Sequence, residues 1–125
     1  MKCQKYKVVS QLESQAQSDF IRYARFVLKD RQHLIFAIPN GGSRNIIEAS
    51  NLKKQGVVAG VPDLFLAIPN KDYHGLFIEM KRETKSKVSD NQKEVIALLK
   101  SQGYAVEICY GFQEAVDCFN NYLAK

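Results

Sequence analysis

A capped helix between two apolar segments is the feature that most constrains how this chain folds. Residues 76–82 and 105–110 are mostly apolar with the composition of strands, and residues 89–102 have the pattern of a helix. Ser89 and Gln92 form an S-x-x-Q capping box at its start, and Gly103 is placed to end it. A helix that joins two strands in this way is typical of a right-handed crossover between parallel strands.

Five further segments complete the predicted order. They are a helix at 10–29 that begins with a Ser10/Glu13 capping box, strands at 33–38 and 63–68, a short polar helix at 44–55, and a helix at 112–123. The order α-β-(α)-β-β-α-β-α predicts an α/β fold, with a mixed central sheet flanked by helices. The length of 125 residues is that of a single domain, residues 1–125.

Composition narrows the classes of function. The net charge of +5 favours polyanionic partners, either nucleic acid or an anionic membrane surface. The sequence has no run of about 18 apolar residues, so we expect no membrane span. The N-terminus lacks the apolar region of a signal peptide, and the three cysteines form no CxxC pair. We therefore expect an intracellular protein in a reducing compartment.

The strand at 76–82 carries an unusual charged pair. Glu79 and Lys81 are two residues apart and share one face of the strand, although apolar residues surround them. Asp63 opens the preceding strand. If the two strands are neighbours, Asp63 and Glu79 approach each other, and two adjacent carboxylates cannot both stay ionised without a cation.

A divalent metal resolves this repulsion. Mg²⁺ binds oxygen ligands, and the main-chain carbonyl of Met80 is placed to join Asp63 and Glu79. Lys81 would then orient an attacking water or stabilise charge that develops on a phosphate. This set predicts phosphodiester hydrolysis with Mg²⁺ or Mn²⁺. The alternative is a solvated Glu–Lys pair on an edge strand, and Glu83-Thr84-Lys85 shows that the bare pattern is weak.

Several motifs together resemble the VRR-NUC family, a branch of the PD-(D/E)xK nuclease superfamily. They are Gly60-Val-Pro-Asp63, Glu79-Met-Lys81, Gln92 three residues after Ser89, and Gly103-Tyr104 ahead of a strand. The resemblance covers most of the chain. It implies a restriction-endonuclease-like αβββαβ core, the order predicted above from the pattern of residues alone.

The resemblance also implies roles for individual residues. Asp63 and Glu79 would bind the metal, Lys81 would be the catalytic lysine, and Gln92 would lie close to the site. The family tends to carry an acidic residue on the first helix, for which Glu13 is the candidate and Glu48 the fallback. Gln92 and Glu13 each have an alternative role, as the last residue of a capping box.

Basic residues around the proposed site are candidates for binding the DNA backbone. They are Arg44, Lys53, Lys54, Arg82, Lys85 and Lys87. For each one alone, ordinary surface charge is the alternative. No base-reading motif is present, which favours recognition of DNA structure over sequence.

Similarity to stand-alone family members implies a homodimer that acts on branched DNA, including four-way junctions and flaps. Apolar residues that would either form the dimer interface or pack inside are Ile46, Ile47, Val57 and Val58. Two other functions compete with this hypothesis. One is a nucleic-acid-binding module without catalysis, and the other is a sequence-specific restriction-type endonuclease on the same fold.

Overall fold

A four-stranded mixed sheet forms the centre of the molecule. The computed structural model describes the backbone of residues 2–39, 46–82 and 86–125, and the side chains of these residues except 2–13 and 46. The strands lie in the order β1 (Ile35–Ala37), β2 (Leu64–Leu66), β3 (Leu76–Lys81) and β4 (Ala105–Tyr110). The pairs β1/β2 and β2/β3 are antiparallel, whereas β3/β4 is parallel, as the capped helix between those two strands predicted.

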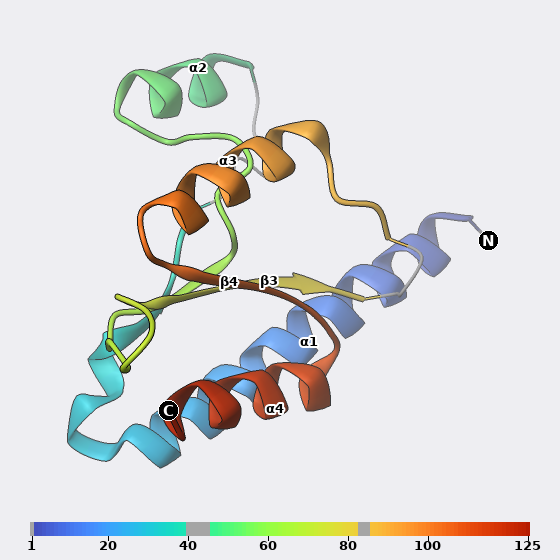
Figure 1. Cartoon of the computed structure of the whole chain (residues 1–125). Helices are drawn as coiled ribbons and strands as arrows, with labels where there is room; N and C mark the ends of the chain where they lie inside the picture. The colour runs from blue at the N-terminus through green and yellow to red at the C-terminus, as the bar shows by residue number, and fades with distance from the viewer. Residues whose placement is uncertain (1, 40–45, 83–85) are drawn as a thin grey trace.

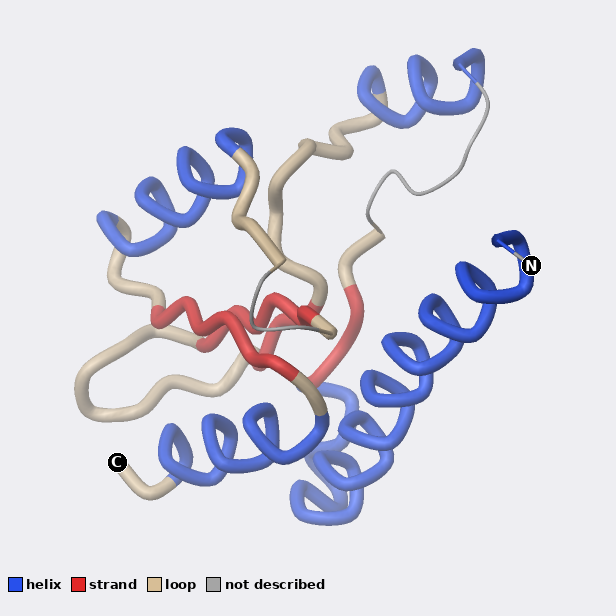
Figure 2. The backbone as a smooth tube through the Cα atoms, turned by 90° about the vertical axis from the view of Figure 1, so that its right-hand side faces the viewer, coloured by secondary structure: helices blue, strands red, loops and turns tan. Residues whose placement is uncertain are grey.

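Helices cover both faces of this sheet. They are α1 (Lys2–Leu28), the 3₁₀ helix η1 (Lys29–Leu34), α2 (Ile46–Lys54), α3 (Asp90–Ser101) and α4 (Phe112–Leu123). Helices α1 and α4 lie against one face, and α3 lies over the other (Figure 1). Helix α2 stands apart from the sheet and packs little against the rest (Figures 1 and 2). The predicted fold class, an α/β fold with a mixed sheet flanked by helices, is confirmed.

The main hydrophobic core fills the space between the sheet and the α1/α4 layer. Leu76, Ile78 and Met80 of β3 are buried there. On the helices, Phe20 and Phe119 meet edge to face with ring centroids 5.7 Å apart. Side chains alternate along a strand, so burying 76, 78 and 80 on this face turns 77, 79 and 81 toward α3. The packing of β3 therefore fixes the face on which its charged pair lies.

The second half of the chain follows the predicted elements closely. Strand β4 and helix α4 have the predicted bounds, and β3 ends one residue earlier than predicted. Helix α3 carries the predicted capping box, in which the Ser89 hydroxyl accepts from the Gln92 N–H and the Gln92 side chain accepts from the Ser89 N–H. Gly103 follows the helix with φ of 89°, a conformation that glycine adopts without strain.

The first half differs at the ends of its elements. Helix α1 begins at Lys2 and not at Ser10, so the predicted Ser10/Glu13 capping box is wrong. The chain leaves α1 at Lys29, whose φ is 56°, and η1 takes residues 33 and 34 from the predicted first strand. Strand β2 spans only Leu64–Leu66, which leaves Asp63 just outside it. No described helix is both long and apolar enough to cross a membrane.

Candidate active site

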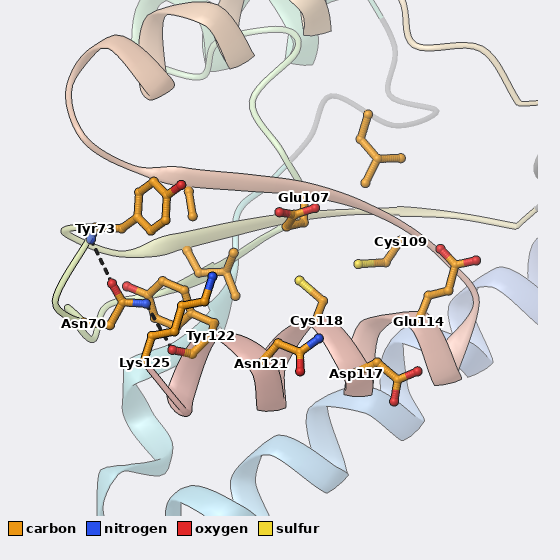
Figure 3. Close-up of a pocket in the computed structure, with 13 residues that line it drawn as sticks. Asn70, Tyr73, Glu107, Cys109, Glu114, Asp117, Cys118, Asn121, Tyr122 and Lys125 are labelled. Carbon is orange, nitrogen blue, oxygen red and sulfur yellow. Dashed lines mark hydrogen bonds between the residues drawn. The ribbon is translucent and has the colours of Figure 1, made fainter.

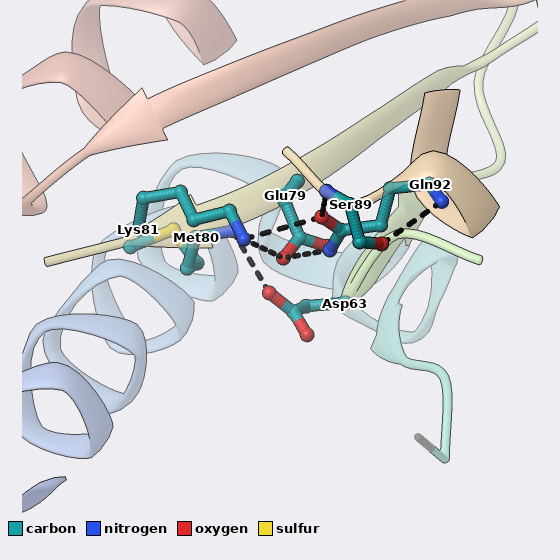
Figure 4. Close-up of polar contacts among 6 residues, drawn as sticks. All are labelled: Asp63, Glu79, Met80, Lys81, Ser89 and Gln92. Atoms are coloured by element: carbon teal, nitrogen blue, oxygen red, sulfur yellow. Dashed lines mark hydrogen bonds and ion pairs between the residues drawn. The ribbon is translucent and has the colours of Figure 1, made fainter. Parts of the chain in front are cut away.

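Strand register brings Asp63 and Glu79 together. The last β2/β3 pair is Leu64 with Ile78, so the next residues along the two chains are Asp63 and Glu79. The main-chain pairing of β2 and β3 ends at this point. Beyond it the Asp63 side chain bonds to β3 instead, and its Oδ2 accepts a hydrogen bond of 2.8 Å from the Met80 N–H (Figure 4). The Asp63 main-chain oxygen accepts from the N–H of residue 38 at 2.7 Å. Asp63 is thereby held between β1 and β3.

The Met80 carbonyl lies at the same opening of the sheet. The N–H and C=O of one strand residue project toward the same edge, and the Met80 N–H points to Asp63. The Met80 oxygen therefore also faces the β2 side, two residues beyond the point where β2/β3 pairing ends. The Met80 carbonyl is therefore a candidate ligand at this opening, and its role in binding a metal stays a prediction.

Glu79 is buried, with only 5% of its surface exposed, on an interior strand of the sheet. Its Oε2 accepts a 2.9 Å hydrogen bond from Gln92 Nε2 and lies 3.6 Å from Lys81 Nζ. Its Oε1 is buried and has no hydrogen-bond partner within the described part of the chain. A solvated Glu–Lys pair on an edge strand, the alternative considered above, does not match this environment.

The electrostatics of the pair favour a bound cation. Burial, and then the negative charge of Asp63, raise the pKa of Glu79 to about 7, against the lowering effect of Lys81 and the Gln92 hydrogen bond. The unpartnered Oε1, the Asp63 carboxylate and the Met80 carbonyl are all hard oxygen donors, which suit Mg²⁺ or Mn²⁺. No three His, Cys, Asp or Glu side chains cluster in ligand geometry among the described residues.

Gln92 serves the helix cap and the charged cluster in one conformation. Its Oε1 accepts from the Ser89 N–H at 3.0 Å and from Lys81 Nζ at 3.3 Å, while its Nε2 donates to Glu79 (Figure 4). The sequence left open whether Gln92 belongs to the cap or to the site. The geometry makes the two compatible, because the residue that caps α3 also bridges Glu79 and Lys81.

Gly60 lets the loop before Asp63 touch the first turn of α3. A Cβ placed at residue 60 would lie 2.6 Å from the carbonyl carbon and oxygen of Asn91 and 2.9 Å from the Gln92 nitrogen. Its φ of 94° also disfavours any other residue. Gly60 was noted in the sequence only as part of a motif, because its contact with α3 depends on packing between distant segments. The sequence signal that could have indicated this contact is the glycine three residues before Asp63.

The remaining predicted residues are not all brought to the site. Lys53 and Lys54 end α2 and are exposed, and Arg82 and Lys87 are exposed on the chain that leaves β3. Arg44 and Lys85 lie outside the described residues. Glu13 lies within α1, but its side chain is not described, so its predicted role stays a prediction. Glu48 is exposed in the first turn of α2.

A separate cavity of about 410 Å³ opens between β4 and α4 (Figure 3). By the strand register it lies on the opposite face of the sheet from Glu79. Glu107, Glu114 and Asp117 give its lining a negative charge, which would repel a phosphate backbone. The hydrogen bond between the Cys109 thiol and Cys118, together with burial, raises the pKa of Cys109, so this thiol stays neutral there. We therefore place the candidate active site at the Asp63–Glu79–Lys81 cluster and not in this cavity.

The mixed sheet with two carboxylates and a lysine at the end of its antiparallel pair defines a nuclease-type α/β domain. The family model described as the VRR-NUC domain matches residues 4–113, and the chain belongs to this family. A solved structure described as a "VRR_NUC domain protein" is similar over 90% of this chain and 88% of its own, with a TM-score of 0.76 and 27% identity. A search among curated proteins gave no match. Nucleases of this family generally use divalent metals.

Proposed function

We propose that this protein is a Mg²⁺- or Mn²⁺-dependent endonuclease that hydrolyses phosphodiester bonds in branched DNA. The observation that carries the proposal is Glu79, a buried carboxylate whose Oε1 lacks a hydrogen-bond partner within the described residues and whose neighbour is a second carboxylate. The pKa of Glu79 stays at about 7 even with the Lys81 ammonium beside it, so a further cation would be needed to keep it fully ionised at neutral pH. The VRR-NUC family of the chain supports nuclease chemistry at this point.

Asp63, Glu79 and the Met80 carbonyl would hold the metal. When bound, it would supply Lewis-acid polarisation of the phosphate and lower the pKa of the attacking water. The aliphatic side chains of β3 pack on the opposite face against α1 and α4, which gives these oxygen ligands a rigid support. Glu13 on α1 is a further proposed ligand.

Lys81 would act on the reacting phosphate. Its ammonium group is held between Glu79 Oε2 and Gln92 Oε1, and 16% of its side chain remains exposed. A fixed positive charge at this position orients a water or stabilises charge that develops on the phosphate oxygens. Gln92 would position both partners, since it donates to Glu79 and accepts from Lys81.

The proposed substrates follow from which features of DNA the candidate contact residues can recognise. The proposed backbone contacts are Arg44, Lys53, Lys54, Arg82, Lys85 and Lys87, which bind phosphate without regard to base identity. With no base-reading motif in the sequence, DNA shape is the better criterion for selection. Four-way (Holliday) junctions and flaps are the proposed substrates, consistent with a role in DNA repair or recombination inside the cell.

A homodimer would suit a four-way junction, because two symmetric sites match two symmetric cuts. Ile47 and Val58 are 74% and 54% exposed and are the better candidates for its interface. Val57 is half-buried, and the side chain of Ile46 is not described. The dimer remains part of the proposal.

The test is a panel of labelled linear duplex, flap, fork and four-way junction, each with Mn²⁺ or with EDTA, with product ends mapped. We expect cleavage only with the metal and paired symmetric nicks on the junction. Junction binding without products on any substrate would support the non-catalytic binding module instead. Cutting at one short motif in linear duplex would support the restriction-type alternative.

A further inference from the structure

A row of aromatic rings crosses the sheet on the same face as the candidate active site. Phe36 of β1 pairs with Phe65 of β2, which pairs with Phe77 of β3. Phe77 is two residues from Glu79, so the row and Glu79 share a face. Phe65 and Phe77 stack with centroids 4.3 Å apart, and the Phe36 ring meets Phe65 edge to face at 5.8 Å.

Phe36 is the exposed end of this row. It lies on the edge strand β1 and is 44% exposed, whereas Phe77 at the interior end is 9% exposed. Single exposed aromatic residues are common and need no explanation by themselves. Phe36 differs because Phe65 restrains its ring and because α2, the element that follows β1, stands away from the sheet (Figure 2).

The position of Phe36 relative to Asp63 suggests what it contacts. Asp63 lies two residues before Phe65, the partner of Phe36, and such diagonal cross-strand neighbours are about 7–8 Å apart. This separation is comparable to the length of one nucleotide. A phosphate bound by the Lys81 ammonium group, beside Asp63 and Glu79, would therefore place an adjacent base within reach of the Phe36 ring.

We propose that Phe36 stacks on an unpaired nucleobase next to the scissile phosphate, and so selects DNA with unpaired nucleotides near the cut. The inference rests on the proposed nuclease function and names the feature of branched DNA that the site recognises. A base within a duplex is already stacked on both sides and is not available to the ring. Stacking on an aromatic side chain changes affinity by roughly 5- to 150-fold per base, with little dependence on base identity.

The experiment measures binding in EDTA to two labelled DNAs, a flap with 2-aminopurine at the unpaired position next to the branch and a fully paired duplex of the same length. For the wild type we expect quenching of 2-aminopurine by the flap complex. Phe36→Ala and Phe36→Leu should lose roughly 5- to 150-fold affinity for the flap and none for the duplex, and Phe36→Trp should retain the preference. Phe26→Ala is the matched control, because Phe26 is 80% exposed on α1, at the other face of the sheet.

Equal affinity of Phe36→Leu and wild type for the flap, or an equal loss on flap and duplex, would overturn the proposal. Sedimentation and thermal melting of each variant complete the design. Loss of a dimer in the Phe36 variants would assign this residue to contact between copies of the chain and overturn stacking. Because binding is read without metal, the result stands even if the wild type cuts no DNA, which is the separate failure of the nuclease proposal.

Discussion

Glu79 and Lys81 lie next to each other on one face of β3, but they have different proposed roles: Glu79 binds the metal and Lys81 acts on the phosphate. Glu79 is buried with an oxygen that lacks a partner among the described residues, whereas the Lys81 ammonium contacts Glu79 Oε2 and Gln92 Oε1 in the same cluster. Removing a carboxylate should therefore affect metal binding, whereas removing the lysine should affect the reaction. The two effects can be measured separately.

Mn²⁺ affinity gives the first prediction. Asp63→Asn removes one negative ligand but keeps an oxygen that can accept from the Met80 N–H, so we expect a folded protein with affinity lower by about 10-fold or more, in line with the loss of one ligand contact. Lys81→Met removes a nearby positive charge and should bind Mn²⁺ at least as tightly as the wild type. Isothermal titration calorimetry measures both. Unchanged affinity in Asp63→Asn would remove Asp63 from the metal site.

The raised pKa of Glu79 gives a pH-dependent prediction. The folded state holds the Glu79 proton up to about pH 7, whereas the ordinary value is 4.5. The free energy of unfolding of metal-free protein should therefore fall as pH rises between these two values, and the cost should be fully present above pH 7. The neutral variant Glu79→Gln lacks this cost. Its advantage over wild type should grow with pH by on the order of 2–3 kcal/mol, measured by urea unfolding in EDTA.

A stability difference between Glu79→Gln and wild type that stays constant from pH 4.5 to pH 8 would contradict the assignment. The comparison cancels contributions from other titrating groups, since the two proteins differ only at this side chain. The effect should shrink in Mn²⁺, because a bound cation favours the ionised carboxylate.

At the scale of elements, the first turn of α3 connects the fold to the site. Gln92 sits in this turn, and Gly60 allows the loop before Asp63 to lie directly against it. The loop and the helix are thus placed relative to each other by backbone contact. A change at Gly60 should move residues that never contact it through their side chains.

Gly60→Ala should cost both stability and activity. The positive φ alone costs about 1–2 kcal/mol, and the added Cβ must also displace Asn91 and Gln92. Displacement of the Gln92 contacts by about 1 Å would lower kcat by up to 10²-fold. Gly56→Ala is the matched control, because Gly56 has φ of 107° but nothing lies within 4 Å of a Cβ added there. Equal activity of the two variants would contradict a positioning role for Gly60.

The sequence predicted the elements best where local signals and burial agree. Helix α3 carries both a capping box and a following glycine, and strands β3 and β4 are apolar enough to be recognised as buried. The start of α1 was wrong because Ser10 and Glu13 form a capping pattern that also occurs inside a helix, where nothing local forbids continuation. Helix η1 escaped prediction because a polar 3₁₀ segment has no periodicity of its own.

The candidate site was predictable in its members and not in its contacts. Glu79 and Lys81 were identified because they are charged residues in an apolar strand. Asp63 was identified because it opens the preceding predicted strand. The hydrogen bond from Met80 to Asp63, the double use of Gln92 and the contact at Gly60 all depend on segments that are distant in sequence. No periodicity or local propensity encodes such contacts.

At the scale of the whole molecule, the net charge of +5 attracts the protein to the negatively charged DNA backbone. Lys53 and Lys54 lie exposed at the end of α2. If each neutralises one phosphate, Lys53→Ala and Lys54→Ala should each reduce the slope of log affinity against log salt by about 0.9 on duplex DNA. Lys71→Ala, in the β2–β3 loop at the far end of β3 from Lys81, should leave the slope unchanged. Equal slopes for all three variants would contradict a DNA-binding role for α2.

Cleavage of a labelled four-way junction by wild type and Lys81→Met, each with Mn²⁺ or EDTA, tests the central claim most directly. We predict that the wild type cuts only with the metal, and that Lys81→Met binds the junction but cuts about 10²–10³-fold more slowly. Lys100→Met, at an exposed position of α3, should cut like the wild type. Cleavage in EDTA, or a Lys81→Met rate equal to that of the wild type, would contradict a metal-dependent nuclease site at Asp63, Glu79 and Lys81.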